Sequence, residues 1–325
     1  MKFLSLFFDL LEPVFRLGQR VLGLQRLGWL FVAPNMIVFG LFCFLPIAIN
    51  FIYAGTGGVQ LMPLSRPYTG AENFQILFEC SNYLDFSTCR KDVFWRAIFN
   101  TLKFSVLQVS LMVLFSLITA LVLNRKIIGR GFWRGVFFYP VLLSPVVVAL
   151  IWKWLLQNQG VFNAGLAAMQ WPTVEWLSDA GWAFFWTVFV SIWSHMGFYT
   201  LILLAGLQAI PRDLYEAAEM DRASPWRTLT RITLPLLMPN LVVVLVLAAI
   251  RAVQVFDEVF VLTGGGPGSA TTFIVQFIYQ TGFAEQIHLY GLAAAASLAL
   301  AGFLVLLTLV QLRLSRASEL GQKGR

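Results

Sequence analysis

The chain is poor in charge, in histidine and in cysteine. Only 12% of its 325 residues are charged, about half of the ~25% that is usual for a soluble domain. So few charged side chains cannot cover a water-facing surface, and a hydrophobic share of 58% argues equally against a disordered chain. Two histidines and three cysteines offer little material for a metal site or a zinc motif. The composition therefore predicts a multi-pass membrane protein without a metal site.

Long apolar runs are what the sequence has in abundance. Six of them reach the length of about 20 residues that a membrane-spanning helix needs. We predict spans at 27–53, 97–123, 135–156, 182–207, 234–262 and 288–312. The predicted fold class is therefore all-α, a polytopic membrane protein with one six-helix transmembrane domain over residues 27–312. Residues 1–26 alternate Leu and Phe with Arg, which predicts an amphipathic helix on the cytoplasmic surface, with a frayed tail as the alternative.

The placement of positive charge predicts the orientation of these spans. Sixteen of the 23 Lys and Arg residues lie in four segments, at 1–26, 125–134, 212–231 and 313–325. Cytoplasmic loops are rich in Lys and Arg, so both termini, including the tail at 313–325, are predicted to be cytoplasmic. The same rule places the 54–96 loop in the periplasm. The net charge of +7 thus indicates orientation in a lipid membrane rather than binding to nucleic acid.

Two of the three cysteines lie in the predicted periplasmic loop. Cys80 and Cys89 are separated by eight residues, and on the oxidising side of a membrane such a pair is expected to form a disulfide. Two free thiols are the alternative. Cys43 lies inside the first span and is interpreted as a small packing residue.

The loop at 208–233 is long and patterned for a connection between two membrane helices. Pro211 occupies a favoured helix start. Leu214, Ala217, Ala218 and Asp221 follow at helical spacing, so they share one face with little bulk. This pattern is typical of a short helix that docks into a partner. An interfacial helix on lipid is the alternative, but acidic residues such as Glu216 argue against it.

The sequence of this loop resembles a known motif. Glu216-Ala217-Ala218 is followed by Asp221 and Ala223, then by Ile232, Leu234-Pro235 and Pro239. The pattern is similar to the EAA loop of inner-membrane permease subunits of binding-protein-dependent ABC importers. Further elements of the carbohydrate-uptake group (maltose and glycerol-3-phosphate permease-like) are found in the same order at 68–74, 94–101, 131–140, 193–198, 256–268 and 291–295.

The resemblance implies a type I ABC importer permease fold and a coupling helix that fits a groove of the nucleotide-binding subunit. The residues that it assigns to this coupling are Glu216, Ala217, Ala218, Asp221, Arg222 and Ala223. Arg222 departs from the family, which has glycine at this position. If the backbone there is left-handed, Arg carries a steric cost that glycine avoids. The alternative is that Arg222 adds a contact to the ATPase.

The fifth predicted span contains a set of polar residues, Arg251, Gln254, Asp257 and Glu258, which are candidates for a substrate path. Arg251, Gln254 and Asp257 are spaced by three residues and would form a polar stripe on one face of a continuous helix. Sugars also pack on aromatic rings, which adds the candidates Trp152, Trp193, Phe198, Tyr199 and Phe256. A structural network toward a partner permease is the alternative interpretation of the stripe.

The resemblance implies half of a translocation pore for a sugar, glycoside or related polyol in the bacterial inner membrane. It implies as partners a second homologous permease, two ATP-binding subunits and a periplasmic substrate-binding protein. ATP and magnesium would be bound by the partners, so we expect no cofactor in this chain and no enzymatic activity of its own. Alternatives are uptake of a glycerol phosphate or a sulfonated glycoside and, more remotely, a stand-alone secondary transporter.

An intramembrane serine protease is a rival from another class. Ser191, Ser194 and His195 lie close together in the sequence, but no Gly-x-Ser-x-Gly element accompanies them. The glycine-rich stretch at 263–268 lacks the Gly-Lys-Ser/Thr ending of a phosphate-binding loop. We therefore expect no catalytic residues and no nucleotide site.

Overall fold

The computed structural model describes residues 27–323, and this part of the chain is built from helices with only two isolated bridges. The amphipathic helix that we predict at 1–26 lies outside the described residues. The elements in chain order are α2 (Leu27–Phe39), η1 (Gly40–Phe44), α3 (Leu45–Ala54), η2 (Pro63–Ser65), α4 (Glu72–Phe78), η3 (Phe86–Thr88), α5 (Asp92–Asn124), α6 (Arg130–Phe138), η4 (Tyr139–Leu142), α7 (Pro145–Leu156), α8 (Val161–Ala168), α9 (Ala180–Ala209), α10 (Asp213–Met220), α11 (Pro225–Thr228), η5 (Leu229–Thr233), α12 (Leu234–Val253), α13 (Asp257–Leu262), α14 (Ile274–Tyr279), η6 (Gln280–Ala284) and α15 (Tyr290–Lys323).

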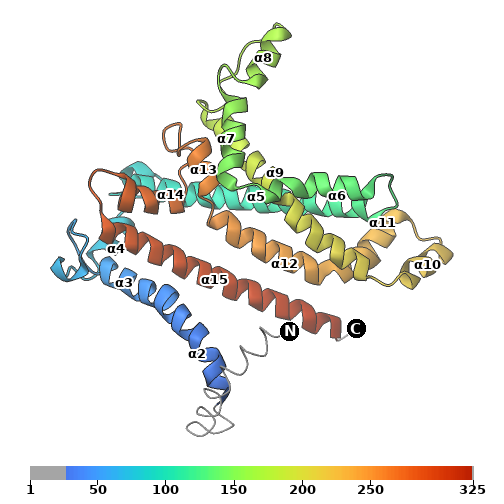
Figure 1. Ribbon diagram of the computed structural model, residues 1–325, viewed down its shortest axis with the longest axis horizontal. Coiled ribbons are helices and arrows are strands. Elements are labelled where there is room, and N and C mark those ends of the chain that lie inside the picture. The colour runs from blue at the N-terminus through green and yellow to red at the C-terminus, as the bar shows by residue number, and fades with distance from the viewer. Residues whose placement is uncertain (1–26, 324–325) are drawn as a thin grey trace, which may run out of the picture.

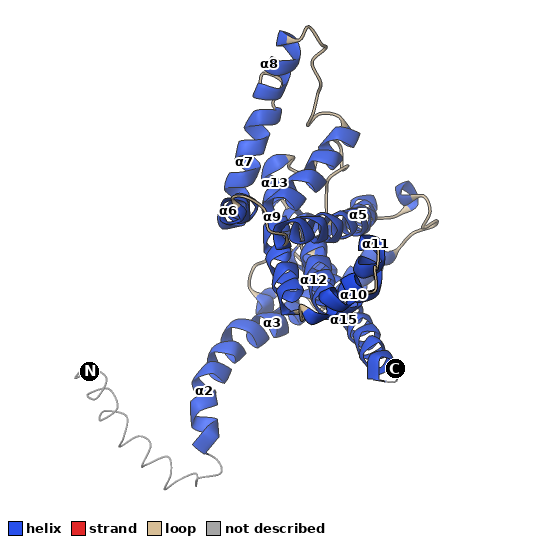
Figure 2. Cartoon of the chain, turned by 90° about the vertical axis from the view of Figure 1, so that its right-hand side faces the viewer, coloured by secondary structure: helices blue, strands red, loops and turns tan. Residues whose placement is uncertain are grey.

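The long helices α5, α9, α12 and α15 form an elongated bundle, from which α7 and α8 project on one side and α2 on the other (Figures 1 and 2). Its main core is apolar and lies between α5, α9 and α12, where side chains such as Phe104, Leu203 and Leu237 are fully buried. A second core joins α3, α4 and α14 to the alanine-rich start of α15. Burial of this kind holds helices together through close packing.

Five helices in the described residues are long and apolar enough to cross a membrane, and there are six if one bent pair counts as a single span. This confirms the all-α, multi-span fold class. The predicted spans at 97–123 and 182–207 correspond to α5 and α9, each only slightly longer than expected. The last helix, α15, continues through Lys323 and so takes in most of the segment that we predict as a tail.

The predicted third span at 135–156 is not one straight helix. Residues Arg130–Leu142 and Pro145–Ala168 form a pair that is bent by 98°. The cause is Pro145, because the residues before a proline are driven out of the helical region. Ser144 accordingly has an extended backbone with ψ of 136°.

The predicted fifth span at 234–262 is wrong as a single helix. It breaks after Val253, and Phe256 leaves the helical region before α13 begins at Asp257. No proline or glycine causes this break. Asp257 and Glu258 stand in the first turn of α13, where acidic side chains are stabilised by the positive end of the helix dipole.

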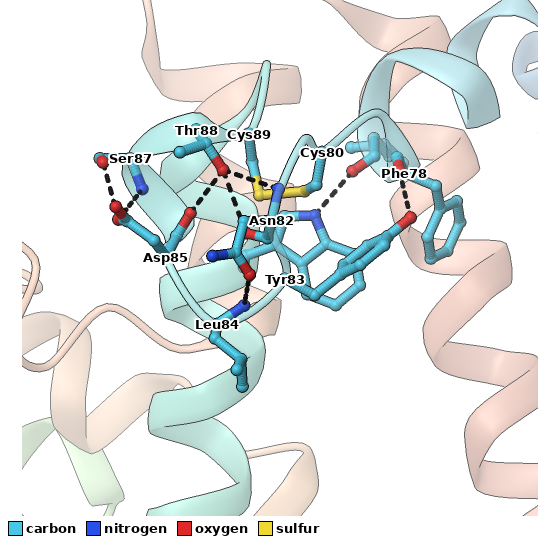
Figure 3. Close-up of a disulfide and its surroundings, with 11 residues drawn as sticks. Phe78, Cys80, Asn82, Tyr83, Leu84, Asp85, Ser87, Thr88 and Cys89 are labelled. Atoms are coloured by element: carbon cyan, nitrogen blue, oxygen red, sulfur yellow. Dashed lines mark hydrogen bonds between the residues drawn. A yellow bond between two sulfur atoms is a disulfide. The ribbon is translucent and has the colours of Figure 1, made fainter.

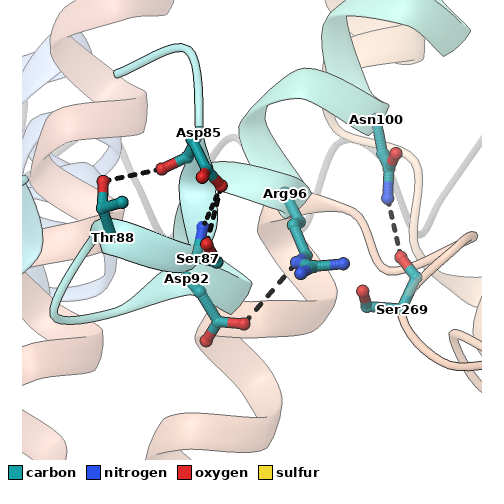
Figure 4. Close-up of polar contacts among 7 residues, drawn as sticks. All are labelled: Asp85, Ser87, Thr88, Asp92, Arg96, Asn100 and Ser269. Carbon is teal, nitrogen blue, oxygen red and sulfur yellow. Dashed lines mark hydrogen bonds and ion pairs between the residues drawn. The ribbon is translucent and has the colours of Figure 1, made fainter. Parts of the chain in front are cut away.

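The 54–96 loop is compact. Cys80 and Cys89 are joined by a disulfide (Figure 3). The Tyr83 hydroxyl donates a hydrogen bond to the Phe78 carbonyl at 2.9 Å. The hydroxyl and N–H of Ser87 donate to Asp85 (Figure 4), and these bonds hold the pKa of the Asp85 carboxyl below its usual range.

This loop is anchored to the bundle through Arg66, and a second polar contact lies just beyond the loop, in α5. Arg66 is buried, donates to both Oγ1 and the carbonyl oxygen of Thr56, and lies over the rings of Tyr53 and Tyr290. Near the start of α5, the Asn100 amide donates to the Ser269 carbonyl at 2.7 Å (Figure 4). The second contact joins α5 to the glycine-rich loop between α13 and α14.

Gly197 sets how closely α9 approaches α6. A Cβ atom at this position would collide with the backbone of Phe137 and Phe138. We therefore expect Gly197→Ala to lower the free energy of unfolding by about 1–3 kcal/mol, as overpacking does in a dense core. The apparent melting temperature of the solubilised protein measures this.

Gly302→Ala is the matched control, because Gly302 also lies in a long helix but a Cβ atom there would meet nothing within 4 Å. It should be neutral or stabilising, since alanine is favoured over glycine inside a helix by about 1 kcal/mol. An equal loss of stability in both variants would contradict the packing argument.

Candidate functional site

The segment between α9 and α12 carries a short, exposed helix at one end of the bundle. In Figures 1 and 2, α10 and α11 lie at the end of the molecule where α9 ends and α12 begins. Asp213 and Glu216 lie in the first turn of α10, where the positive end of the helix dipole stabilises their negative charges. Ala218 is the only buried residue of α10. A short helix with a polar, solvent-facing surface is suited to contact a partner.

The candidate coupling residues differ in how they are placed. Glu216, Ala217, Asp221 and Arg222 are exposed. Ala218 faces the bundle, and Ala223 is half-buried. The helix is held from behind by Tyr215, whose hydroxyl lies 3.2 Å from Thr233 Oγ1 and whose ring packs against the main core. The structure thus brings the acidic side chains and Ala217 together on a free surface, with Ala218 as part of the attachment.

Arg222 adopts the left-handed backbone conformation considered above for the position at which the family motif has glycine. Its φ is +51°. The N–H of Ala223 donates to the Ala218 carbonyl and that of Arg222 to the Glu219 carbonyl, both at 2.9 Å. This is the Schellman pattern, which closes a helix through a left-handed residue just after its end. The turn after α10 is therefore the expected one, made here with arginine in place of glycine.

A polar cluster lies inside the bundle, where α9, α12 and α13 meet. Arg251 Nη2 hydrogen-bonds His195 Nε2. His195 Nδ1 lies 2.7 Å from Ser194 Oγ and 2.9 Å from the Ser191 carbonyl. Ser191 Oγ in turn donates to Glu258 Oε1 at 3.4 Å. A buried charge needs such partners, so the cluster is a chain of side chains that support each other.

A cavity of about 310 Å³ opens onto this cluster. It is lined on one side by the polar groups of Ser194, His195 and Arg251. The other walls are aromatic or formed by the bend between η4 and α7, and they comprise Pro140, Val141, Leu143, Pro145, Phe198 and Tyr199. Its volume is at the lower end of the ~300–1,000 Å³ that is usual for ligand pockets. Polar groups facing aromatic walls form a site that can bind a small polar molecule.

The candidate path residues therefore separate into groups. Arg251, Phe198 and Tyr199 line the cavity. Gln254 and Asp257 do not continue a stripe from Arg251, because the helix ends between them, and both are exposed. Phe256 instead stacks on Phe260, with ring centroids 5.3 Å apart.

Trp152 and Trp193 belong to a separate aromatic cluster. Their ring centroids are 5.5 Å apart, and neither residue lines the cavity. Trp152 also contacts the rings of Phe162, Trp186 and Phe189, so the cluster joins α7 and α8 to α9. These tryptophans support the projecting arm of the molecule rather than the polar site.

The sequence indicates Glu258 as a polar residue of the fifth span, but it does not indicate that Ser194, His195 and Glu258 belong to one cluster. Ser191 and His195 are four residues apart on one helix face, and this spacing is the signal by which the sequence could indicate their contact. Their partner Arg251 comes from another helix, and no sequence spacing indicates this contact. Among the side chains that the structure describes, no group of three or more His, Cys, Asp or Glu could hold a metal ion.

Comparison with known proteins agrees with this architecture. Residues 112–319 match the family described as "Binding-protein-dependent transport system inner membrane component". The trehalose/maltose transport system permease protein MalF of Thermococcus litoralis is 37% identical over 292 residues, covering 90% of this chain and 94% of that protein. The sulfoquinovosyl glycerol transport system permease protein SmoG of Agrobacterium fabrum is 32% identical, with 92% and 93% covered.

A similar fold is found in the crystal structure of a bacterial alginate ABC transporter in complex with an alginate pentasaccharide-bound periplasmic protein. The match has a TM-score of 0.76 and 25% identity, and it covers 92% of this chain and 97% of that one. The helical bundle, its spans and these matches define a multi-pass permease subunit of an ABC importer with the type I fold. The chain belongs to the family of binding-protein-dependent transport system inner membrane components. This confirms the resemblance carried by the Glu216–Asp221 motif.

The left-handed Arg222 yields a direct prediction. We expect Arg222→Gly to raise the free energy of unfolding by about 0.5–1 kcal/mol, because the left-handed cost of a side chain exceeds the entropy cost of glycine. Thermal unfolding of the solubilised protein measures the change.

Arg222→Ala is the control, because alanine removes the guanidinium but keeps the Cβ atom that causes the strain. It should give no stabilisation. If Arg222→Gly lowered the free energy of unfolding, or if both variants raised it equally, the side chain rather than the backbone would determine stability at this position.

Proposed function

We propose that this permease forms half of a translocation pore for a sugar, glycoside or related polyol, with a second homologous permease as the other half. A periplasmic binding protein would deliver the substrate, and two partner ATPase subunits would bind ATP with magnesium and drive transport. Both termini and α10 would face the cytoplasm of a bacterial inner membrane, as the distribution of Lys and Arg predicts.

The observation that carries this proposal is the exposed helix α10. It presents Glu216, Ala217 and Asp221 to solvent, and it is fastened to the bundle through Ala218 and Tyr215. A helix that is free on one face and fixed on the other can transmit a push or pull from a docked partner. The segment that contains α10 connects α9 to α12, and these two helices carry the polar cavity.

The proposed mechanism is alternating access. Closure of the ATPase subunits would move α10, and α9 and α12 would tilt with it, so that the cavity opens to one side of the membrane at a time. Ser194, His195 and Tyr199 provide hydrogen-bonding groups for substrate hydroxyls, and the ring of Phe198 provides an apolar wall. The sugars in the names of the relatives support a carbohydrate as the substrate class.

The coupling role predicts the effect of reversing one charge. Glu216→Lys should reduce ATPase association and substrate uptake by at least about tenfold, because a mismatched charge at an interface costs several kcal/mol. Copurification of the ATPase and uptake by reconstituted vesicles measure the two effects.

Glu285→Lys is the matched control. Glu285 is exposed like Glu216 but follows η6, outside the α10 segment. It should leave association and uptake unchanged. The coupling role would be refuted if Glu216→Lys retained both properties at the wild-type level.

A second candidate substrate class is anionic, as in a sulfonated glycoside or a glycerol phosphate. The observation that favours it is Arg251, which lines the cavity while its Nε atom is buried without a hydrogen-bond partner. A sulfonate or phosphate oxygen could accept from this donor, and such charge-assisted bonds are strong.

The variant Arg251→Gln distinguishes the two substrate classes. For an anionic sugar, removal of the charge should raise the KM for uptake about tenfold or more, which corresponds to the ~1.5–3 kcal/mol of a hydrogen bond to a charged group. For a neutral disaccharide, the KM should change little. Uptake assays with one sulfonated and one neutral glycoside decide which class the cavity selects. A larger rise in KM for the neutral sugar than for the sulfonated one would exclude the anionic class.

A further inference from the structure

A second cavity lies beside α10 and is strongly basic. It has a volume of about 1350 Å³ and opens between the α5–α6 connection, the end of α9 and the α10–η5 segment. Glu219 is the only acidic residue among those that line it. Its cations come from two separate stretches of the chain, and they are Arg125, Lys126, Arg130, Arg134 and Arg212.

Two of these arginines converge on one neutral group. With the amide of Gln208 oriented so that its oxygen faces them, this oxygen accepts from Arg134 Nη2 at 2.7 Å and from Arg130 Nη2 at 2.9 Å. The Nε atoms of both arginines are buried and have no hydrogen-bond partner. Among the described residues, none of the five cations lies within ion-pair distance of a carboxylate.

Within the described part of the chain, the positive charges and buried donors of this cavity lack a negatively charged partner. Two guanidinium groups that share one amide oxygen repel each other, and buried donors without partners cost free energy. An anion with several acceptor oxygens would relieve both problems. The planar fork of an arginine matches a phosphate group in particular, and a pair of arginines with nearby Lys126 can surround one.

The position of the cavity also fits a phosphate at the membrane surface. Asn124 ends the apolar helix α5 and Arg130 begins α6, so the basic connection lies where a span leaves the hydrocarbon. In the orientation that the proposed function adopts, this is the cytoplasmic headgroup layer, where basic pockets between helices bind anionic lipids. The cavity is also lined by Tyr215, Glu219 and Ala223 of the coupling segment.

We propose that this basic cavity is a binding site for a phosphate group, provided by the headgroup of an anionic phospholipid or by a free phosphate ester. The bound phosphate accepts hydrogen bonds from Arg130 and Arg134, and the exposed cations Arg125 and Lys126 attract it. Because the coupling segment forms one wall, an occupied site holds α10 against the α5–α6 connection. The orientation rests on the proposed function, whereas the ligand chemistry rests on the side chains themselves.

The test measures ligand-dependent stability of the full chain, delipidated and purified with the subunits that copurify with it. Phosphatidylglycerol, phosphatidylcholine, inorganic phosphate and glycerol 3-phosphate are added separately, and the apparent melting temperature is recorded. We expect phosphatidylglycerol to raise it and phosphatidylcholine to leave it unchanged. An equal rise with glycerol 3-phosphate identifies a free phosphate ester as the source, and a rise with the lipid alone identifies the headgroup.

Variants connect this response to the cavity. Arg130→Gln with Arg134→Gln should raise the half-saturating ligand concentration about tenfold or more, as expected for the loss of charge-assisted hydrogen bonds. Arg125→Gln with Lys126→Gln removes exposed charges of the same cavity without touching the Gln208 contact, so it tests the site even if the first pair impairs folding. It should weaken the response in the same direction.

Arg227→Gln with Arg231→Gln is the matched control, since both residues are exposed cations of the α10–η5 segment beside the cavity and neither lines it. It should respond like the wild type. The proposal is overturned if no phosphate compound stabilises the wild-type protein, or if the control pair loses as much response as the cavity pairs. The assay involves no transport, so a failure here leaves the coupling role of α10 intact, and a failure of coupling leaves this binding site intact.

Discussion

Arg251 and His195 face each other between α12 and α9, and the polar contact between them joins two largely apolar helices. A guanidinium within a span is costly unless its hydrogen bonds are satisfied. His195 satisfies one of these bonds and is itself held by Ser194 and the Ser191 carbonyl. The break after Val253 lets the chain turn, so that α13 packs against α7 and α9 and the Glu258 carboxylate reaches Ser191. The cavity, the helix break and the bend at Pro145 all adjoin this contact.

The same two helices lead directly to the coupling segment. α9 ends at Ala209 and α12 begins at Leu234, so the residues between them tie both helices to α10. The Schellman closure at Arg222 and the Tyr215–Thr233 contact give this connection a defined shape. A displacement of α10 would therefore be carried along α9 and α12 to the polar cavity, where Arg251 and His195 stand opposite each other. The close approach of α9 to α6 at Gly197 keeps the cavity wall formed by η4 in place.

Much of the fold follows from the sequence because a lipid environment imposes few solutions. In a lipid bilayer, an apolar run of about 20 residues satisfies its backbone hydrogen bonds as a spanning helix, and α5 and α9 are found where they are expected. Pro145 carried the signal for the bend in the third span, although length alone favours a straight helix. The break before Asp257 had a weaker signal, an acidic pair at the start of α13, because no proline or glycine marks it.

The candidate site was predictable to the extent that it is local in the sequence. The α10 segment and the turn at Arg222 depend on neighbouring residues, so motif and helical spacing indicate them. The polar cavity depends on α9, α12 and α13 meeting in space, and no spacing in the sequence joins His195 to Arg251. For the same reason Trp152 and Trp193, which are plausible sugar contacts by composition, prove to belong to an aromatic cluster of the projecting arm.

The central claim is that events at α10 reach the polar cavity. The most direct measurement is the accessibility of a cysteine at Phe198→Cys, in a background with Cys43 replaced by serine, because Phe198 lines the cavity and is partly exposed. In the complete transporter, a membrane-impermeant thiol reagent is applied from the binding-protein side with and without ATP. We predict that the labelling rate of this cysteine changes when ATP is added. The same rate in both conditions would contradict it.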